Sequence, residues 1–122
     1  MPRIIRLHHA QITIPRGSED AARDFYVGML GLTEIPKPDS LRQRGGLWLA
    51  VGALQLPIGV EDGIDRSATK AHLAWQVDDL NGWRERLNRH GIVIAESVPI
   101  PGFERYEFRD PFGNRIELIQ PD

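Results

Sequence analysis

The stretch DPFGNRIELI, residues 110–119, decides the fold that this sequence predicts. Pro111 presets φ for an early turn position, and Gly113 or Asn114 can take positive φ. The first half of the stretch therefore predicts a tight turn. The second half alternates and is mostly apolar, which predicts a strand that closes a hairpin.

One charged residue interrupts that strand. Glu117 lies between Ile116 and Leu118, where burying an unpaired carboxylate is costly. We therefore expect Glu117 to have a partner. The simplest partner is an arginine such as Arg105 or Arg115, and the rest of the chain suggests a second possibility.

The chain repeats one order of elements. The first half predicts a strand, a helix and three strands, over residues 4–14, 18–31, 32–35, 47–51 and 54–60. After a polar connection over residues 61–69, the second half predicts the same order: a strand over 71–77, a helix from Asp78 or Asp79 to Gly91, and strands over 92–98, 105–109 and 115–120. We therefore expect one domain made of two modules, residues 4–60 and 70–120.

Two alignments between the halves agree. Residues 9–14 align on residues 72–77 with an offset of 63, and residues 54–56 align on residues 116–118 with an offset of 62. Both halves then carry a histidine on the first strand and Gln or Glu on the last, namely His9, Gln55, His72 and Glu117. These side chains meet on one concave face if the two sheets curl toward each other.

The repeated polar residues suggest a metal site. His9, His72 and Glu117 form a set of two histidines and one carboxylate, which suits a divalent ion such as Fe, Mn, Ni, Co or Zn. Gln55 adds a neutral oxygen. His8 is expected to face the other side of the strand. Such a set leaves coordination positions open for substrate or water.

Composition excludes several classes of protein. The chain has 122 residues, 41% hydrophobic and 26% charged, with a formal net charge of −2 and no cysteine. Arginines alternate with acids, so there is no basic patch for nucleic acid. The chain start has no signal-peptide core, and no apolar run approaches the roughly 18 residues of a membrane span. We expect a cytoplasmic protein without disulfides, thiolate metal sites or a cysteine nucleophile.

The motifs together resemble the vicinal oxygen chelate superfamily. The resemblance rests on HAQITI (residues 9–14), FY (25–26), LGL (30–32), His72 and DPFGN (110–114) leading to Glu117, and it extends over residues 7–120. That superfamily includes glyoxalase I, bleomycin-resistance proteins, fosfomycin-resistance transferases, methylmalonyl-CoA epimerase and extradiol dioxygenases.

The resemblance implies an α+β fold in which two βαβββ modules, with curved mixed sheets, form a cup-shaped cavity around a metal, usually in a homodimer. His9, Gln55, His72 and Glu117 fall on the ligand positions of the family. Glyoxalase I generally has a carboxylate where this chain has Gln55. Because an amide cannot serve as a base, the resemblance fits an epimerase, a dioxygenase or a thiol transferase better than a glyoxalase.

Two functions follow as hypotheses. The first is a divalent-metal-dependent enzyme of the lyase, isomerase or dioxygenase type, in which the ion acts as a Lewis acid on a small bidentate oxygen substrate and Glu117 is both ligand and proton carrier. The second is a metal-free drug-binding protein of the bleomycin-resistance type. For either, the expected pocket residues are Gln11, Trp48, Gln76, Phe103 and Tyr106.

Overall fold

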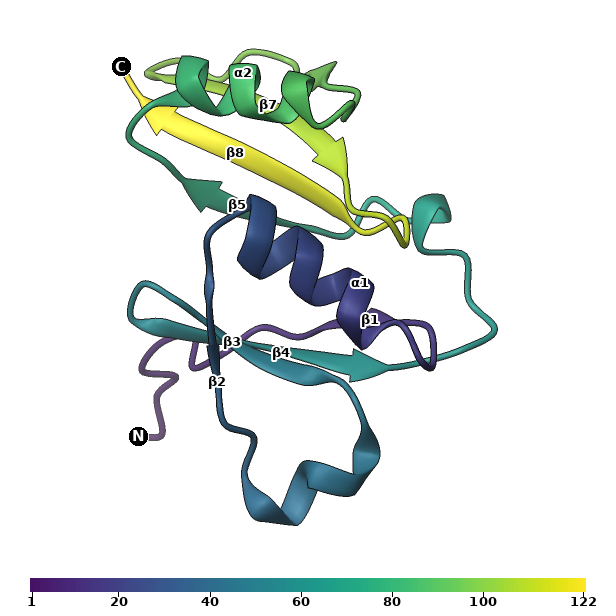
Figure 1. Cartoon of the computed structure of the whole chain (residues 1–122). Coiled ribbons are helices and arrows are strands. Elements are labelled where there is room, and N and C mark those ends of the chain that lie inside the picture. The colour runs from purple at the N-terminus through teal and green to yellow at the C-terminus, as the bar shows by residue number, and fades with distance from the viewer. The chain divides into compact units, whose positions relative to one another are not determined.

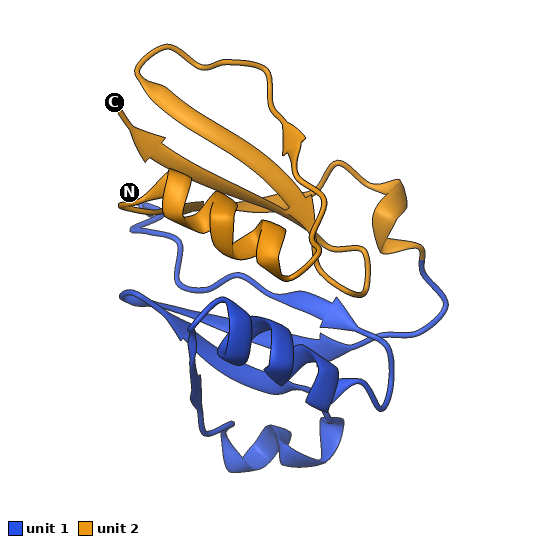
Figure 2. Cartoon of the chain, turned by 45° about the horizontal axis from the view of Figure 1, so that its top comes forward, with its two compact units in different colours: residues 1–64 blue, residues 65–122 orange.

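The computed structural model describes all 122 residues and divides into two compact units, residues 1–64 and 65–122 (Figure 2). Each unit contains one four-stranded mixed sheet. The strand orders are β1-β4-β3-β2 in unit 1 and β5-β8-β7-β6 in unit 2 (Figure 1). The two units therefore share one topology, and the predicted α+β architecture of two βαβββ modules is confirmed.

The elements of unit 1 are β1 (Ile12–Ile14), α1 (Glu19–Arg23), the π-helix η1 (Asp24–Met29), β2 (Thr33–Ile35), the 3₁₀ helix η2 (Asp39–Arg44), β3 (Leu47–Val51) and β4 (Leu54–Val60). Those of unit 2 are the 3₁₀ helix η3 (Arg66–Ala68), β5 (His72–Gln76), α2 (Leu80–Arg89), β6 (Ala95–Glu96), β7 (Phe103–Arg109) and β8 (Arg115–Pro121). None of the helices has the length and apolar character needed to cross a membrane.

Each helix covers one face of its own sheet, because strand alternation turns the apolar side chains to that side. In unit 1 the buried apolar residues on the covered face are Ile14, Leu47, Leu49, Leu56 and Ile58. In unit 2 they are Tyr106, Phe108, Ile116 and Leu118, which α2 meets with Leu80 and Leu87. The intervening residues of each strand lie on the uncovered face, and these are the polar positions of interest.

The hairpin of unit 1 joins the two strands expected over residues 47–51 and 54–60. Val51 pairs with Leu54 across a two-residue turn in which Gly52 has φ 56°, and Ala50 pairs with Gln55. Residues that flank such a turn form a hydrogen-bonded pair, and the pairs then alternate along the hairpin. Leu56, the neighbour of Gln55, is buried on the covered face, so strand alternation turns Gln55 to the uncovered face.

The first strand is shorter than the predicted residues 4–14. The structure has only β1, preceded by an isolated parallel bridge between His9 and Gln55. The register of β1 against β4, continued back by one residue, places Gln11 opposite Pro57. By the hairpin alternation the Pro57 nitrogen faces β1, and proline has no N–H to donate there. The ladder therefore breaks between the bridge and β1.

Two further elements differ from prediction. The helix expected over residues 18–31 is α-helical only in α1 and continues as the π-helix η1, whose wider turns bury Phe25, Tyr26 and Met29. The strand expected over residues 92–98 is reduced to β6, which pairs with β7 over two residues. The helix cap of unit 2 is as predicted: Asp79 accepts a hydrogen bond from the Gly82 N–H at 3.0 Å.

The turn before β8 is built around Asp110, which is 5% exposed. Asp110 Oδ1 accepts hydrogen bonds from the backbone N–H groups of Phe112 (2.9 Å) and Asn114 (2.8 Å), and Oδ2 accepts one from Asn114 Nδ2 at 2.8 Å. Gly113 has φ 102°, and a Cβ there would lie 3.0 Å from Ser67 N. This turn fixes where β8 begins, and so fixes the face from which Glu117 projects.

Candidate functional site

Unit 1 brings together His9 and Gln55. They are directly paired by the isolated parallel bridge, and both side chains are exposed. His9 Nδ1 lies 3.0 Å from Nδ1 of His8, so His8 does not simply face away as the strand alternation predicts. The chain is not a regular strand at this point, which removes the alternation. His9 Nε2 makes no hydrogen bond and is available to a ligand.

Unit 2 brings together His72 and Glu117. The Nε2 atom of His72 lies 3.2 Å from Glu117 Oε1, and Nδ1 lies 2.9 Å from the carbonyl oxygen of Lys70. A carbonyl only accepts hydrogen bonds, so Nδ1 must carry a proton. The Nε2 atom that faces the carboxylate then needs either a second proton or a cation, because two lone pairs cannot stabilise that contact.

Arg105 is the other partner of Glu117. Its Nη1 atom donates to Glu117 Oε1 at 2.9 Å, while Nε and Nη2 donate to the carbonyl oxygen of Val98 at 3.0 and 2.5 Å. The side chains of Arg105 and Glu117 are only 15% and 5% exposed. The cost of burying the carboxylate is therefore offset by a cation that the Val98 carbonyl holds in place.

Arg115, the alternative partner in the sequence, binds a different carboxylate. Its Nε donates to Glu107 Oε2 at 2.6 Å. Glu107 and Glu117 are directly paired across β7 and β8. The two carboxylates thus lie side by side on the uncovered face of the sheet, each with its own arginine.

The five expected pocket residues lie in different environments. Gln76 and Phe103 are exposed and lie on the same face of their sheet as Glu117. Tyr106 corrects the prediction: it is 0% exposed, and its hydroxyl donates to the Leu80 carbonyl at 2.8 Å, under α2. Burial raises the pKa of Tyr106 to about 12. Tyr106 is a core residue of unit 2.

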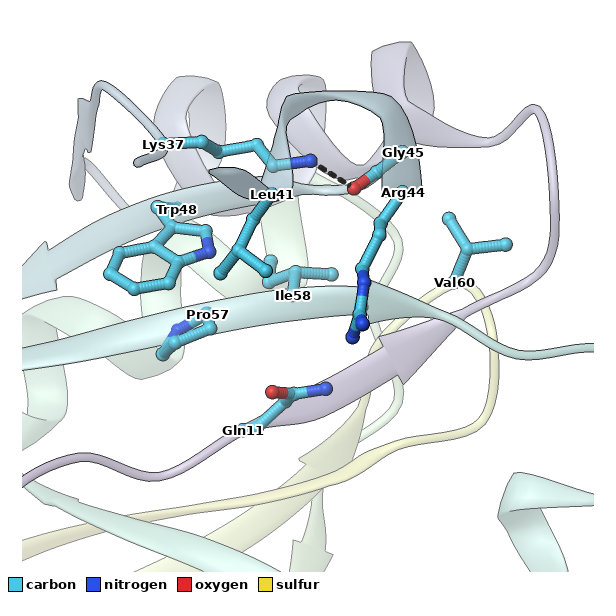
Figure 3. Close-up of a pocket in the computed structure, with 10 residues that line it drawn as sticks. Gln11, Lys37, Leu41, Arg44, Gly45, Trp48, Pro57, Ile58 and Val60 are labelled. Atoms are coloured by element: carbon cyan, nitrogen blue, oxygen red, sulfur yellow. Dashed lines mark hydrogen bonds between the residues drawn. The ribbon is translucent and has the colours of Figure 1, made fainter. Parts of the chain in front are cut away.

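The other two expected residues, Gln11 and Trp48, both line a pocket of about 190 Å³ within unit 1. It lies between η2 and the uncovered face of strands β3 and β4 (Figure 3). The remaining lining residues are Lys37, Leu41, Arg44, Gly45, Pro57, Ile58, Gly59 and Val60. The sequence reasoning missed Lys37 and Arg44. The Gly45-Gly46 pair after Arg44 was the available signal, because both glycines have positive φ and a Cβ on Gly46 would lie 2.0 Å from the Ile58 carbonyl oxygen.

Each unit therefore presents one imidazole next to one oxygen donor, and no group of three His, Asp or Glu side chains that could hold a metal ion is gathered in the chain. The donor types suit a borderline divalent ion. The spacing in unit 2 also fits. Two ligand atoms that are each about 2.1 Å from one ion lie roughly 3.0–3.4 Å apart, and the measured separation between His72 Nε2 and Glu117 Oε1 is 3.2 Å.

Comparison with known proteins gives one family and several solved structures. The family model Glyoxalase/Bleomycin resistance protein/Dioxygenase superfamily matches residues 6–118. The crystal structure of a glyoxalase family protein from Bacillus anthracis is 36% identical, with 100% of each chain covered and a TM-score of 0.92. A search of curated proteins finds no match.

Two more distant structures share the fold. A variant of the fosfomycin resistance protein FosX from Listeria monocytogenes, complexed with Mn(II) and 1S,2S-dihydroxypropylphosphonic acid, is 20% identical over 98% of this chain and 95% of that one, with a TM-score of 0.80. TnmS3, an antibiotic binding protein from Streptomyces sp. CB03234, is 23% identical over 98% of this chain and 100% of its own, with a TM-score of 0.69. The same fold thus occurs in a metal complex and in an antibiotic binding protein.

Proposed function

Because the chain belongs to the glyoxalase/bleomycin resistance protein/dioxygenase superfamily, we propose that it is a divalent-metal-dependent enzyme acting on a small bidentate oxygen substrate. The observation that carries the proposal is the contact between His72 Nε2 and Glu117 Oε1. The Lys70 carbonyl holds the imidazole proton on Nδ1, which leaves Nε2 turned to the carboxylate as a metal ligand requires. The Mn(II) complex of a FosX variant supports a metal in this fold.

Four residues would hold the ion: His9, Gln55, His72 and Glu117. The set has two neutral nitrogens, one amide oxygen and one anionic oxygen, so Glu117 supplies the only negative charge. When bound, a divalent ion there supplies Lewis-acid polarisation of a bidentate oxygen ligand. The repeat in the sequence supports treating the four residues as one set, since each unit contributes the same two positions.

Glu117 and Arg105 have different roles in the proposed reaction. Arg105 donates to Oε1 and fixes the orientation of the carboxylate, in the way that groups behind a metal ligand do. Oε2 makes no hydrogen bond, so it is the oxygen that can accept a proton from a substrate. Gln55 cannot share this task, because an amide has no basic site. An isomerase, epimerase or dioxygenase type of reaction therefore fits better than that of glyoxalase I.

One observation favours a second function, the metal-free binding of a small molecule such as a drug. Arg105 already neutralises Glu117 within unit 2, at 2.9 Å, so the carboxylate does not depend on a metal for its charge balance. The antibiotic binding protein TnmS3 supports such a use of the fold. In this case the pocket that contains Trp48 would hold the ligand without chemistry.

Binding of a bidentate oxygen ligand separates the two functions. The protein is stripped with a chelator and titrated calorimetrically with acetohydroxamate, alone and after reloading with Mn(II). Acetamide, which offers one oxygen, is the matched control ligand. The enzyme proposal expects acetohydroxamate to bind only the Mn(II) form, and acetamide to bind neither. Equal binding of acetohydroxamate to both forms would contradict it and favour the metal-free function.

We also propose a homodimer. Large apolar side chains are exposed, among them Ile4, Ile5 and Leu7, which are 98%, 77% and 65% exposed, and Val93 and Val98. Exposed apolar groups of this kind are typical of surfaces that a partner covers. Light scattering at micromolar concentration is expected to give twice the chain mass of 13.8 kDa, and a monomer would contradict the proposal.

A further inference from the structure

We infer that the pocket of unit 1 is an oxyanion subsite, in which Arg44 and Gln11 bind a carboxylate, phosphonate or phosphate group while Trp48 contacts the apolar part of the same molecule. The inference rests on the proposed function only in identifying this molecule as the substrate. Binding itself requires nothing outside unit 1.

The charged residues that line the pocket are all cationic. Its lining residues include two cations, Lys37 and Arg44, and no carboxylate. Lys37 Nζ is committed to backbone, since it donates to the carbonyl oxygens of Gly45 at 2.5 Å and Arg42 at 3.4 Å. Arg42 is paired with Asp39 at 3.1 Å. Arg44 makes neither an ion pair nor a hydrogen bond, so its five donors are available to a ligand.

The side chains of Arg44 and Gln11 both border the pocket. The guanidinium of Arg44 extends from η2 toward β4, and the amide of Gln11 lies on the opposite side of the same space (Figure 3). The amide of Gln11 packs close to the backbone of Gly59, where a Cβ would be 2.6 Å from Gln11 Nε2 and would shift the amide. Arg44 and Gln11 thus turn two polar donors toward one small space.

The chemistry of these donors selects the ligand. A guanidinium recognises an oxyanion through two parallel hydrogen bonds, and an amide N–H adds a third donor. Trp48, Leu41 and Pro57 form the apolar wall beside them. A cationic ligand would meet like charge, and a neutral one would gain nothing from the charge of the guanidinium.

The subsite also adjoins the proposed metal ligands of unit 1. Gln11 follows His9 by two residues, and Pro57 follows Gln55 by two residues. Two residues of extended chain measure about 7 Å. The substrate we infer is therefore a small acid, whose oxyanion would bind two residues along the chain from His9 and Gln55.

The test uses the full chain stripped of metal with a chelator, so that an ion cannot hold the anion. Calorimetric titrations use phenylphosphonate and phenylacetate as anions and phenylacetamide as the neutral control. Both anions are expected to bind the wild type at millimolar concentration or better, with phenylacetamide at least about tenfold weaker. Their relative affinity tells a phosphonate site from a carboxylate site.

Matched variants identify the arginine. Arg44→Met is expected to weaken anion binding about tenfold or more, and Arg44→Lys by less, because lysine keeps the charge but not the fork. Arg42→Met, on the same helix but paired with Asp39, is the control and should leave binding unchanged. Equal effects of the two methionine variants, or no anion binding to the wild type, would overturn the inference. Neither result would affect acetohydroxamate binding to the Mn(II) form, which tests the proposed function separately.

Discussion

The two units have the same strand order but different uncovered faces. In unit 2, strands β7 and β8 carry Glu117 with Arg105 and Glu107 with Arg115, as neighbouring ion pairs. In unit 1, strands β1, β3 and β4 contain no charged residue, and a pocket occupies the corresponding face. One topology thus provides a fixed carboxylate in one copy and open space in the other.

The pairing of the first and last strands also differs. In unit 1, His9 lies directly opposite Gln55. In unit 2, His72 lies opposite Arg115, two residues from Glu117, and only the side chains of His72 and Glu117 meet. Both units therefore bring a histidine next to an oxygen donor, but the first and last strands pair in registers that differ by two residues. The repeat preserves the two donor groups and not the strand register.

Removing the charged oxygen donor of unit 2 should have the largest effect. Glu117→Gln is expected to lower Mn(II) affinity about a hundredfold or more, because it removes the only anionic ligand of the proposed set and leaves Arg105 as an unbalanced cation. Gln55→Ala in unit 1 should cost about tenfold or less, since water can replace a neutral amide oxygen. Titration of chelator-treated protein with Mn(II) measures both.

The matched control for that comparison is Glu104→Gln, an exposed carboxylate on β7. It changes the net charge by the same amount as Glu117→Gln and should leave Mn(II) affinity unchanged. If Gln55→Ala weakened Mn(II) binding more than Glu117→Gln, the assignment of the charged half-site to unit 2 would be wrong.

The next largest difference is in stability, between substitutions in the turn that joins β7 to β8 and in the turn that joins β3 to β4. Asp110→Ala in unit 2 should lower the free energy of unfolding by about 2–3 kcal/mol, because a buried carboxylate that accepts three hydrogen bonds is lost. The turn of unit 1 holds no such side chain, so Ala53→Ser should change stability by less than about 0.5 kcal/mol. Chemical denaturation measures both, and similar effects of the two substitutions would contradict this comparison.

Tyr106→Phe should have a smaller effect, specific to unit 2. Loss of the hydrogen bond to the Leu80 carbonyl should cost about 1 kcal/mol. The pKa of Tyr106 is raised from 10.0 to about 12, so the folded state favours the neutral phenol. That stabilisation is complete below pH 10 and is lost as the pH rises through about 12. Between pH 9 and 12 the free energy of unfolding should fall less with rising pH for Tyr106→Phe than for the wild type. Identical pH dependence of the two proteins would place Tyr106 outside the core.

The smallest effect concerns an ion pair that the repeat places in both units. Arg23 pairs with Glu34 at 2.9 Å, and Arg84 pairs with Glu96 at 2.6 Å, each joining the helix to an edge strand. Arg84 lowers the pKa of Glu96 below 4.5, so its contribution is present above that pH and fades as the pH falls through the lowered pKa. Because both pairs are exposed, Glu34→Gln and Glu96→Gln should each cost less than about 1 kcal/mol, and less in high salt. A larger loss from one alone would show that the pairs are not equivalent.

Periodicity and repetition predicted most of the fold. The hairpin at Gly52, the cap at Asp79 and the doubled order of elements all depend on local rules that the amino acids carry themselves. The break in the first strand depends on Pro57, whose partner is distant in the sequence. Pattern alone could not show that the ladder would fail at that point.

For the candidate site, the sequence predicted which residues pair through the repeat but not which side chains surround them. Repeat positions identified His72 and Glu117, which the structure brings together, but either Arg105 or Arg115 could have been the partner of Glu117. The choice follows from how each arginine is held, by the Val98 carbonyl or by Glu107, which is a matter of tertiary geometry. Arg44 was missed for the same reason, because only the folded η2 turns it toward β4.

The central proposal is that His9, Gln55, His72 and Glu117 hold one divalent ion. The most direct test measures metal stoichiometry by mass spectrometry after purification without chelator and supplementation with Mn, Ni, Zn, Co and Fe in turn. We predict one ion per chain for the wild type, and loss of most of it in His9→Ala and in His72→Ala alike, with both variants still folded. No bound metal in the wild type under any supplementation, or a full metal content in either histidine variant, would contradict the account.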